Sequence, residues 1–176
     1  MLRAAGFQPI VVPADVDETG LPGEAPAAQV VRLARAKAAA VAARYPSAAV
    51  LGADTVVAID DEILGKPRDE DDARRMLGRL AGRAHRVYTG VALAVGADMC
   101  AEVAMSEVAM ASLSPAEIEW YVASGESRDK AGAYAIQGLA SRYVTSIEGS
   151  YSNVVGLPVA VVYRWLRDLP VIHSQH

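Results

Sequence analysis

The sequence predicts an α/β protein, and three observations lead to that prediction. Apolar residues make up 52% of the 176 residues and charged residues only 22%, which is the composition of a globular chain rather than a disordered one. Short segments with the pattern of β-strands are interspersed with longer segments of helical periodicity. No repeat, low-complexity run or linker divides the chain, so we expect one domain or two closely joined lobes.

The composition also excludes several classes of protein. The net charge is −4 and there is no long run of Lys and Arg, which argues against binding to a nucleic-acid backbone. The single cysteine, Cys100, excludes an internal disulfide and a Cys-rich zinc site, and is typical of a reducing compartment. No apolar run is long enough to span a membrane, and the first residues lack the apolar core of a signal peptide. We therefore expect a soluble cytoplasmic protein with neither a membrane nor a nucleic-acid partner.

Strand and helix patterns alternate along the chain. A short strand is expected at Ile10–Val12, before an acidic loop. An Ala-rich helix begins at Pro26 and extends to about Arg44, where Pro46 acts as a stop. The later elements are a strand, acidic turn and strand within residues 49–64, strands at 86–95 and 101–111, a strand at 141–149 and a closing helix at 157–169.

Two further helices carry the clearest boundary signals. In the helix predicted at residues 69–81, Asp69 can cap the amino end and acidic residues fill the first turn. In the helix predicted at residues 114–125, Ser114 is the cap and Glu117 completes a capping box. The apolar stripe of the first of these helices consists of Ala73, Met76, Leu77 and Leu80.

The segment "LGADTVVAIDDEILGKP", residues 51–67, places a carboxylate inside an apolar strand. An aspartate in a strand most often forms a turn or faces solvent. Here Gly52 permits close approach of another backbone, and the branched residues after Thr55 bury the rest of the strand. The carboxylate of Asp54, held in this way, suits metal coordination or proton abstraction from water.

Lys37 lies in the middle of the apolar face of the Ala-rich helix, with Val30, Leu33 and Val41, whereas Arg32 falls on the opposite side. Two interpretations remain open. In one, the lysine extends from the edge of the apolar stripe into solvent, as long charged side chains commonly do. In the other, the stripe borders a cleft in which the ammonium meets an anion.

Two more lysines, Lys66 and Lys130, lie in tight loops that contain glycine or proline. Loop lysines are usually solvated, so each one alone is weak evidence of a site. Together with Asp17, Glu18 and Asp54 they provide carboxylates for a hard cation and amines for phosphate oxygens, the combination that a metal-bound polyphosphate requires. The chain contains no GxxxxGK[ST] loop, GxGxxG loop or GxSxG elbow, which argues against P-loop, dinucleotide and serine-hydrolase sites.

These segments resemble the Maf family of nucleoside triphosphate pyrophosphatases. The similarity extends over nearly the whole chain and is carried by residues 15–19, 34–42, 51–93 and 121–158 and by the closing helix. It implies an inosine-triphosphatase-like fold: an elongated, twisted, mixed sheet flanked by helices, with two lobes around a central cleft. It also implies a single domain over residues 1–170, a tail at 171–176 and a homodimer.

The resemblance also implies roles for the candidate residues. Asp54 accepts the proton of the attacking water, and Lys37 and Lys66 belong to the catalytic set. Glu18 joins Asp54 in binding a divalent cation, Mg²⁺ or Mn²⁺. The residues implied for substrate binding are Thr55, Lys130 and Gln137.

The "GAYAIQG" form resembles the branch of the family that acts on dTTP and UTP. Two alternatives stay open. One is a non-enzymatic regulator of cell division, since Maf proteins are associated with septum formation. The other is an enzyme that removes damaged purine nucleotides.

The start of the chain departs from the family pattern. Family members begin with a strand and a Ser-x-x-Arg-Arg loop, whereas this sequence begins with "MLRAAGF", within the following helix. Two explanations stay open: either the start is assigned too late, in which case in-frame codons upstream of Met1 should encode that strand and loop, or this form of the protein is impaired. The 176-residue form is then expected to be poorly active and prone to aggregation at an uncovered sheet edge.

Overall fold

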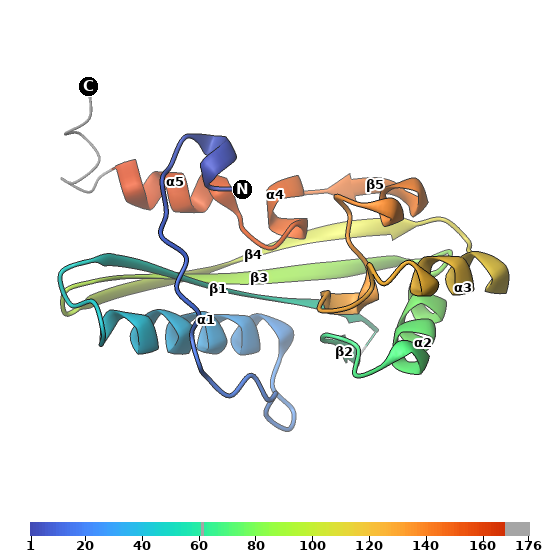
Figure 1. Cartoon of the computed structure of the whole chain (residues 1–176), viewed down its shortest axis with the longest axis horizontal. Coiled ribbons are helices and arrows are strands. Elements are labelled where there is room, and N and C mark those ends of the chain that lie inside the picture. Colours follow the sequence, from blue (N-terminus) through green and yellow to red (C-terminus); the bar gives the residue numbers. More distant parts are fainter. Residues whose placement is uncertain (61, 168–176) are drawn as a thin grey trace. The chain divides into compact units, whose positions relative to one another are not determined.

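A five-stranded sheet with the strand order β2-β1-β3-β4-β5 runs through the computed structural model, which describes residues 1–60 and 62–167 (Figure 1). The strands are β1 (Ala49–Ile59), β2 (Glu62–Leu64), β3 (Ala84–Val95), β4 (Asp98–Met110) and β5 (Val144–Glu148). The α-helices are α1 (Pro26–Ala42), α2 (Glu70–Leu80), α3 (Pro115–Ala123), α4 (Tyr151–Val154) and α5 (Val159–Arg167). Three 3₁₀ helices complete the described elements: η1 (Arg3–Ala5), η2 (Ala131–Ala133) and η3 (Leu139–Tyr143).

The chain divides into two compact units. Unit 1 comprises Met1–Asp54, Thr89–Ala104 and Gly156–His176, and unit 2 comprises Thr55–Tyr88 and Met105–Val155. The division therefore cuts three strands: β1 between Asp54 and Thr55, β3 between Tyr88 and Thr89, and β4 between Ala104 and Met105.

In unit 1, helix α1 lies directly against strand backbones because two glycines make room for it. A Cβ atom on Gly52 of β1 would lie 2.3 Å from the carbonyl oxygen of Ala34. A Cβ atom on Gly90 of β3 would lie 2.3 Å from the carbonyl oxygen of Val30. Neither position can hold a larger residue without moving the helix. The clustered core of this unit is made of small side chains: Ala34, Ala38, Val41, Val50, Ala92 and Ala94.

In unit 2, α2 and α3 begin where the sequence predicts, whereas the short helix α4 was not predicted. Asp69 caps α2 by accepting a hydrogen bond from the Asp72 N–H at 2.8 Å. Ser114 and Glu117 form the predicted capping box of α3. The predicted stripe of α2 is buried in a core of large side chains that also includes Tyr121 and Tyr143.

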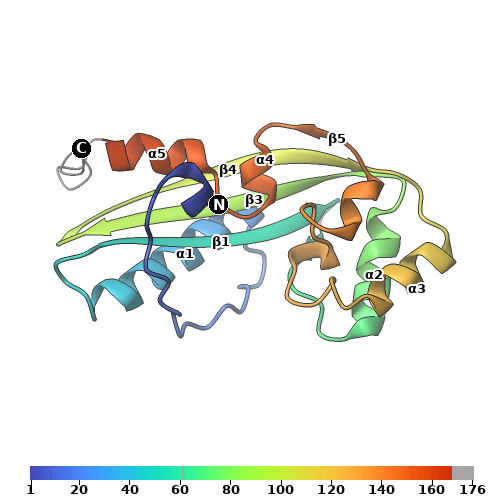
Figure 2. The same cartoon turned by 45° about the horizontal axis from the view of Figure 1, so that its top comes forward.

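Three expectations about the fold need correction. Ile10–Val12 forms no strand, since it makes no ladder with the described strands, and Ile10 is 90% exposed. β5 begins at Val144, later than predicted, because the preceding residues form η3. The sheet is antiparallel, with β1 paired to β2 and β4 to β5 in that sense and the β3 arrow opposite to those of β1 and β4 (Figure 2), so the predicted mixed sheet is wrong.

The remaining predicted elements agree with the structure. The Ala-rich helix, the hairpin of β1 and β2 and the closing helix α5 all form, although the predicted end of α5 and the predicted tail at 171–176 lie outside the described residues. Over the described ranges, no helix combines the length and apolarity needed to cross a membrane.

Candidate functional site

Three predicted residues meet in unit 1. The Lys37 ammonium lies 2.7 Å from Oδ1 of Asp54 and 2.6 Å from Oε1 of Glu18. The side chain of Asp54 is 10% exposed and that of Lys37 18%, whereas that of Glu18, on the loop before α1, is 41% exposed. The Lys37 ammonium therefore bridges the largely buried carboxylate of Asp54 and the exposed carboxylate of Glu18.

The local sequence explains how these groups meet. Gly52, two residues before Asp54, lets the α1 backbone approach β1 closely. Successive strand residues point to opposite faces, so Gly52 and Asp54 share the face that α1 covers. Lys37 lies one helical turn after Ala34, whose carbonyl oxygen abuts Gly52. The Lys37 ammonium contacts two protein carboxylates, and the interpretation that it borders a cleft and meets a substrate anion there stays a prediction.

The charge on Lys37 is well stabilised. Burial opposes that charge, but the hydrogen bonds and charges of Asp54 and Glu18 outweigh burial and raise the pKa of the lysine above its ordinary value. Lys37 is thus an ammonium at neutral pH.

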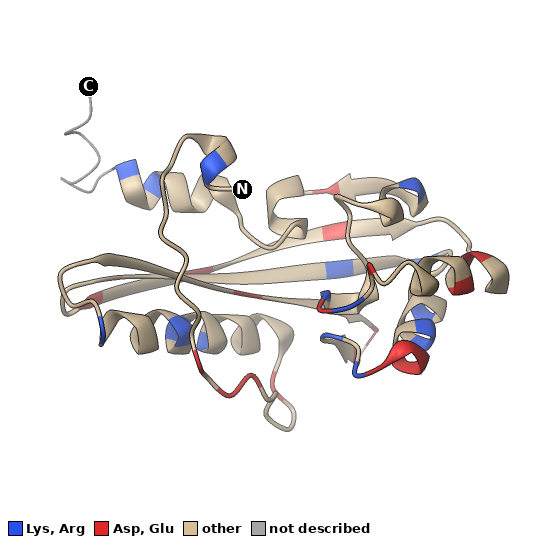
Figure 3. Ribbon diagram, in the orientation of Figure 1, with Lys and Arg blue, Asp and Glu red and all other residues tan. Residues whose placement is uncertain are grey.

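Arg32 orders the loop that carries Glu18, a role that the sequence did not reveal. Its guanidinium binds both carboxylate oxygens of Glu24 at 2.7 and 2.6 Å and donates to the Thr19 carbonyl oxygen at 3.2 Å. In the same loop, Asp17 accepts a hydrogen bond from the Thr19 N–H at 2.9 Å. Figure 3 shows the acidic residues of this loop (red) and the basic residues of α1 (blue). The Glu24–Arg32 pair joins a loop residue to a helix residue, so no helical or strand periodicity in the sequence predicts the contact.

The predicted cation ligands, Glu18 and Asp54, both contact Lys37. Within residues 1–60 and 62–167, no cluster of three or more His, Cys, Asp or Glu side chains is arranged to hold a metal ion. Mg²⁺ commonly takes only one or two carboxylates from a protein and completes its coordination with water and phosphate oxygens. The pair therefore fits a cation that arrives with a phosphorylated substrate, rather than a cation held by protein alone.

The other predicted residues, Thr55, Lys66, Lys130 and Gln137, belong to unit 2. Lys66 and Lys130 lie on loops, as predicted, and both are exposed, as is Gln137. The Gly132 N–H donates to the Gly65 carbonyl oxygen at 3.0 Å, so the segments that carry Lys66 and Lys130 are joined by a backbone hydrogen bond.

Unit 2 also contains a buried polar pair that the sequence did not predict. Nε2 of His85 lies 2.8 Å from the hydroxyl of Tyr134, and the two rings meet edge to face. His85 is 2% exposed, and burial lowers its pKa to about 4, so the imidazole is neutral. Tyr134 lies in the segment between Lys130 and Gln137, which is thereby anchored to β3.

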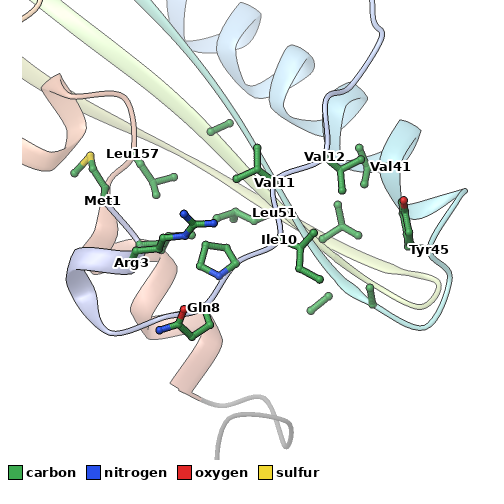
Figure 4. A pocket seen from close by; sticks show the side chains of 16 residues that line it. Met1, Arg3, Gln8, Ile10, Val11, Val12, Val41, Tyr45, Leu51 and Leu157 are labelled. Carbon is green, nitrogen blue, oxygen red and sulfur yellow. The ribbon is translucent and has the colours of Figure 1, made fainter.

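A pocket of about 760 Å³ lies elsewhere in unit 1 (Figure 4). Its lining is mainly apolar and includes Ile10, Val11, Leu51 and Leu157, with Arg3 as its charged residue. Every predicted site residue is described, and none of them lines this pocket. Apolar walls with one cation do not suit a triphosphate.

Comparison with known proteins identified one matching family model and several similar proteins. A model of the family described as "Maf-like protein" matches residues 1–169. A dTTP/UTP pyrophosphatase of Symbiobacterium thermophilum is 51% identical over 159 residues, which cover 90% of this chain and 82% of the relative. Proteins with the same name from Myxococcus xanthus and Pseudoalteromonas atlantica are 57% and 45% identical, over 83% and 99% of this chain and 74% and 93% of the relatives.

Proposed function

The chain belongs to the Maf-like protein family, and from that premise we propose that it hydrolyses nucleoside triphosphates, namely dTTP and UTP, to the monophosphate and pyrophosphate. The observation that carries the proposal is the contact of Lys37 with both Asp54 and Glu18. The names of the similar proteins, each a dTTP/UTP pyrophosphatase, support the choice of nucleotides.

The chemistry needs a base for water, and Asp54 suits that role. Its carboxylate is largely buried but retains some exposure to solvent, and its Oδ1 contacts the Lys37 ammonium. In the proposed reaction, water attacks the α-phosphorus, Asp54 accepts the proton of that water, and the bond from the α-phosphorus to the bridging oxygen breaks. The electron pair of that bond leaves with pyrophosphate, and Lys37 offsets the negative charge that develops on the phosphate oxygens.

Glu18 and Asp54 would hold a divalent cation, Mg²⁺ or Mn²⁺, together with the phosphates of the substrate. When bound, such a cation supplies Lewis-acid stabilisation of phosphate charge. Glu18 is suited to this task because its side chain is the more exposed of the two.

Four residues of unit 2 are proposed to bind substrate. We assign Lys66 and Lys130 to the phosphates, because both are exposed cations on loops tied by the Gly132–Gly65 hydrogen bond. Gln137 offers an amide donor and an acceptor, which match the O4 and N3–H edge of thymine or uracil. Thr55 is proposed as its partner in base selection.

Some proposals rest on family membership rather than on the geometry. They are the inosine-triphosphatase-like fold, a single domain over residues 1–170, a homodimeric assembly and a cytoplasmic location. Sedimentation velocity on the purified chain tests the assembly directly.

Pyrophosphate release from a panel of nucleoside triphosphates, with Mg²⁺ or Mn²⁺ present, tests the proposed activity. We expect dTTP and UTP to give the highest kcat/KM. No release from any nucleotide would favour a regulator that only binds, and preference for ITP would favour an enzyme that removes damaged purine nucleotides.

A further inference from the structure

The flanks of Gln137 are held by a side-chain network, although Gln137 itself is exposed. On the amino-terminal side, the Ala135 N–H donates to the hydroxyl of Tyr121 at 3.0 Å. On the carboxyl-terminal side, the N–H groups of Leu139 and Ala140 donate to the Glu126 carboxylate at 2.9 and 3.3 Å. Tyr121, near the end of α3, and Glu126, in the turn after it, therefore hold the two ends of the five-residue span 135–139.

Tyr121 and Glu126 also influence each other electrostatically, since Tyr121 lowers the pKa of the Glu126 carboxyl. The backbone before Gln137 is held by Tyr121, and the backbone after it is held by Glu126.

Packing holds Tyr121, and hydrogen bonds hold Glu126. Tyr121 has no exposed surface and packs edge to face against Tyr143. Burial disfavours charge on Glu126, yet the Leu139 N–H, Tyr121 and the Ala140 N–H outweigh burial and lower its pKa, so the group is a carboxylate at neutral pH.

Gly138 shows that the space beside Gln137 is adapted to this carboxylate. A Cβ atom at residue 138 would lie 1.9 Å from Oε1 of Glu126. The residue after Gln137 must therefore lack a side chain for Glu126 to reach the two N–H groups that follow.

We propose that Glu126, acting with Tyr121, is the positioning residue that presents Gln137 to the nucleobase and so sets discrimination between pyrimidine and purine triphosphates. This inference rests on the proposed function and on the proposed role of Gln137. Neither Glu126 nor Tyr121 takes part in the hydrolytic step in this scheme.

The test uses Glu126→Gln and Tyr121→Phe, with Glu119→Gln, an exposed glutamate of α3, as the matched control. The Gln variant offers one acceptor oxygen where the carboxylate offers two, and the Phe variant keeps the packed ring. For each variant we expect the ratio of kcat/KM for dTTP to that for GTP to fall about tenfold, the loss of one hydrogen bond to a charged group. The KM for dTTP should rise while kcat stays within about twofold of the wild-type value. Glu119→Gln should leave the ratio unchanged.

A combined variant separates positioning from general damage. Once Gln137→Ala has removed the presented amide, adding Glu126→Gln should change the dTTP/GTP ratio no further. Equal loss of activity on dTTP and GTP in Glu126→Gln, or a further change of the ratio in the Gln137→Ala background, would overturn the inference. Thermal melts of each variant identify any that fail to fold, and Tyr121→Phe provides the second, independent variant.

Binding measurements keep this inference distinct from the proposed function. Calorimetry with the non-hydrolysable α,β-imido analogues of dTTP and GTP reports selectivity without turnover. Selective binding without hydrolysis by the wild-type chain would overturn the proposed activity and leave the inference standing if Glu126→Gln reduces that selectivity. Unchanged selectivity in Glu126→Gln would overturn the inference alone.

Discussion

The clustered core of unit 1 is built from alanine and valine, whereas that of unit 2 includes leucine, methionine and tyrosine. Their polar groups differ accordingly. In unit 1 the small side chains and Gly52 let α1 approach β1 so closely that Lys37 reaches Asp54. In unit 2 the core holds the polar side chains of Tyr121 and His85. Both form hydrogen bonds to the segment that carries Gln137.

The charged pairs show the same contrast. The arginines of α2 bind neighbouring carboxylates at the surface, as Arg74 does with Glu70 and Glu119, and such exposed pairs contribute little to stability. The sheltered contacts of Lys37 instead hold two carboxylates at one point. Small-residue packing thus brings charges together in unit 1, and large-residue packing holds a loop in place in unit 2.

Replacing the cation of unit 1 should produce the largest effect. Lys37→Met removes the ammonium and leaves Asp54 and Glu18 without that partner. We expect kcat/KM for dTTP to fall by about 10²–10³-fold, the usual loss for one charge-stabilising donor at a phosphoryl site. Arg35→Met, an exposed position on the same helix, is the control and should retain activity. Equal kcat/KM values for the two variants in pyrophosphate release would show that the contact between Lys37 and the carboxylates does not contribute to catalysis.

Unit 2 should lose stability in mild acid through His85. The folded-state pKa is about 4 against an ordinary value of 6.5, so the contribution is complete above pH 6.5 and is lost as the pH falls toward 4. The full difference in the free energy of unfolding is about 3 kcal/mol. His85→Phe should remove this part of the pH dependence, which urea titrations at a series of pH values would measure. Parallel pH curves for the wild type and the variant would show that the buried imidazole is not the cause.

Replacing one glycine by alanine in each unit tests whether α1 packs more closely on its strand than α2 packs on its surroundings. Gly52→Ala would place its Cβ 2.3 Å from a backbone oxygen of α1, so the helix must shift. We expect a loss of about 1–3 kcal/mol in the free energy of unfolding, together with reduced turnover. Gly78→Ala on α2 meets nothing within 4 Å, and should be neutral or stabilising by up to about 1 kcal/mol. Equal melting temperatures for the two variants would contradict the close packing of α1 on β1.

Local signals predicted the helices because their evidence lies within a few residues. Asp69 and the Ser114–Glu117 pair make their capping hydrogen bonds three residues away, so the sequence alone shows both partners. A strand depends on a neighbour that the sequence does not identify, which is why the apolar segment Ile10–Val12 gave a wrong prediction.

The same distinction applies to the site. The sequence singled out both Lys37 and Asp54, because a helix face and a strand position define where each side chain points, but it did not predict that the two side chains contact each other. The contacts of Tyr121 with Ala135, and of His85 with Tyr134, join residues 14 and 49 positions apart, each linking a helix or strand to irregular backbone, and no periodicity relates them. Gly138 was the available sign, since a glycine directly after Gln137 suggests that something approaches closely there.

The division between chemistry in unit 1 and base selection in unit 2 is tested most directly by kcat/KM of two variants on dTTP, UTP, GTP and ITP. Asp54→Asn should lower every value by a similar factor, about 10²–10⁴, because it removes the proton acceptor and leaves the base contacts intact. Gln137→Ala should change the ratios among the four nucleotides more than it changes the best rate. Near-normal kcat in Asp54→Asn, or unchanged ratios in Gln137→Ala, would contradict this division of roles.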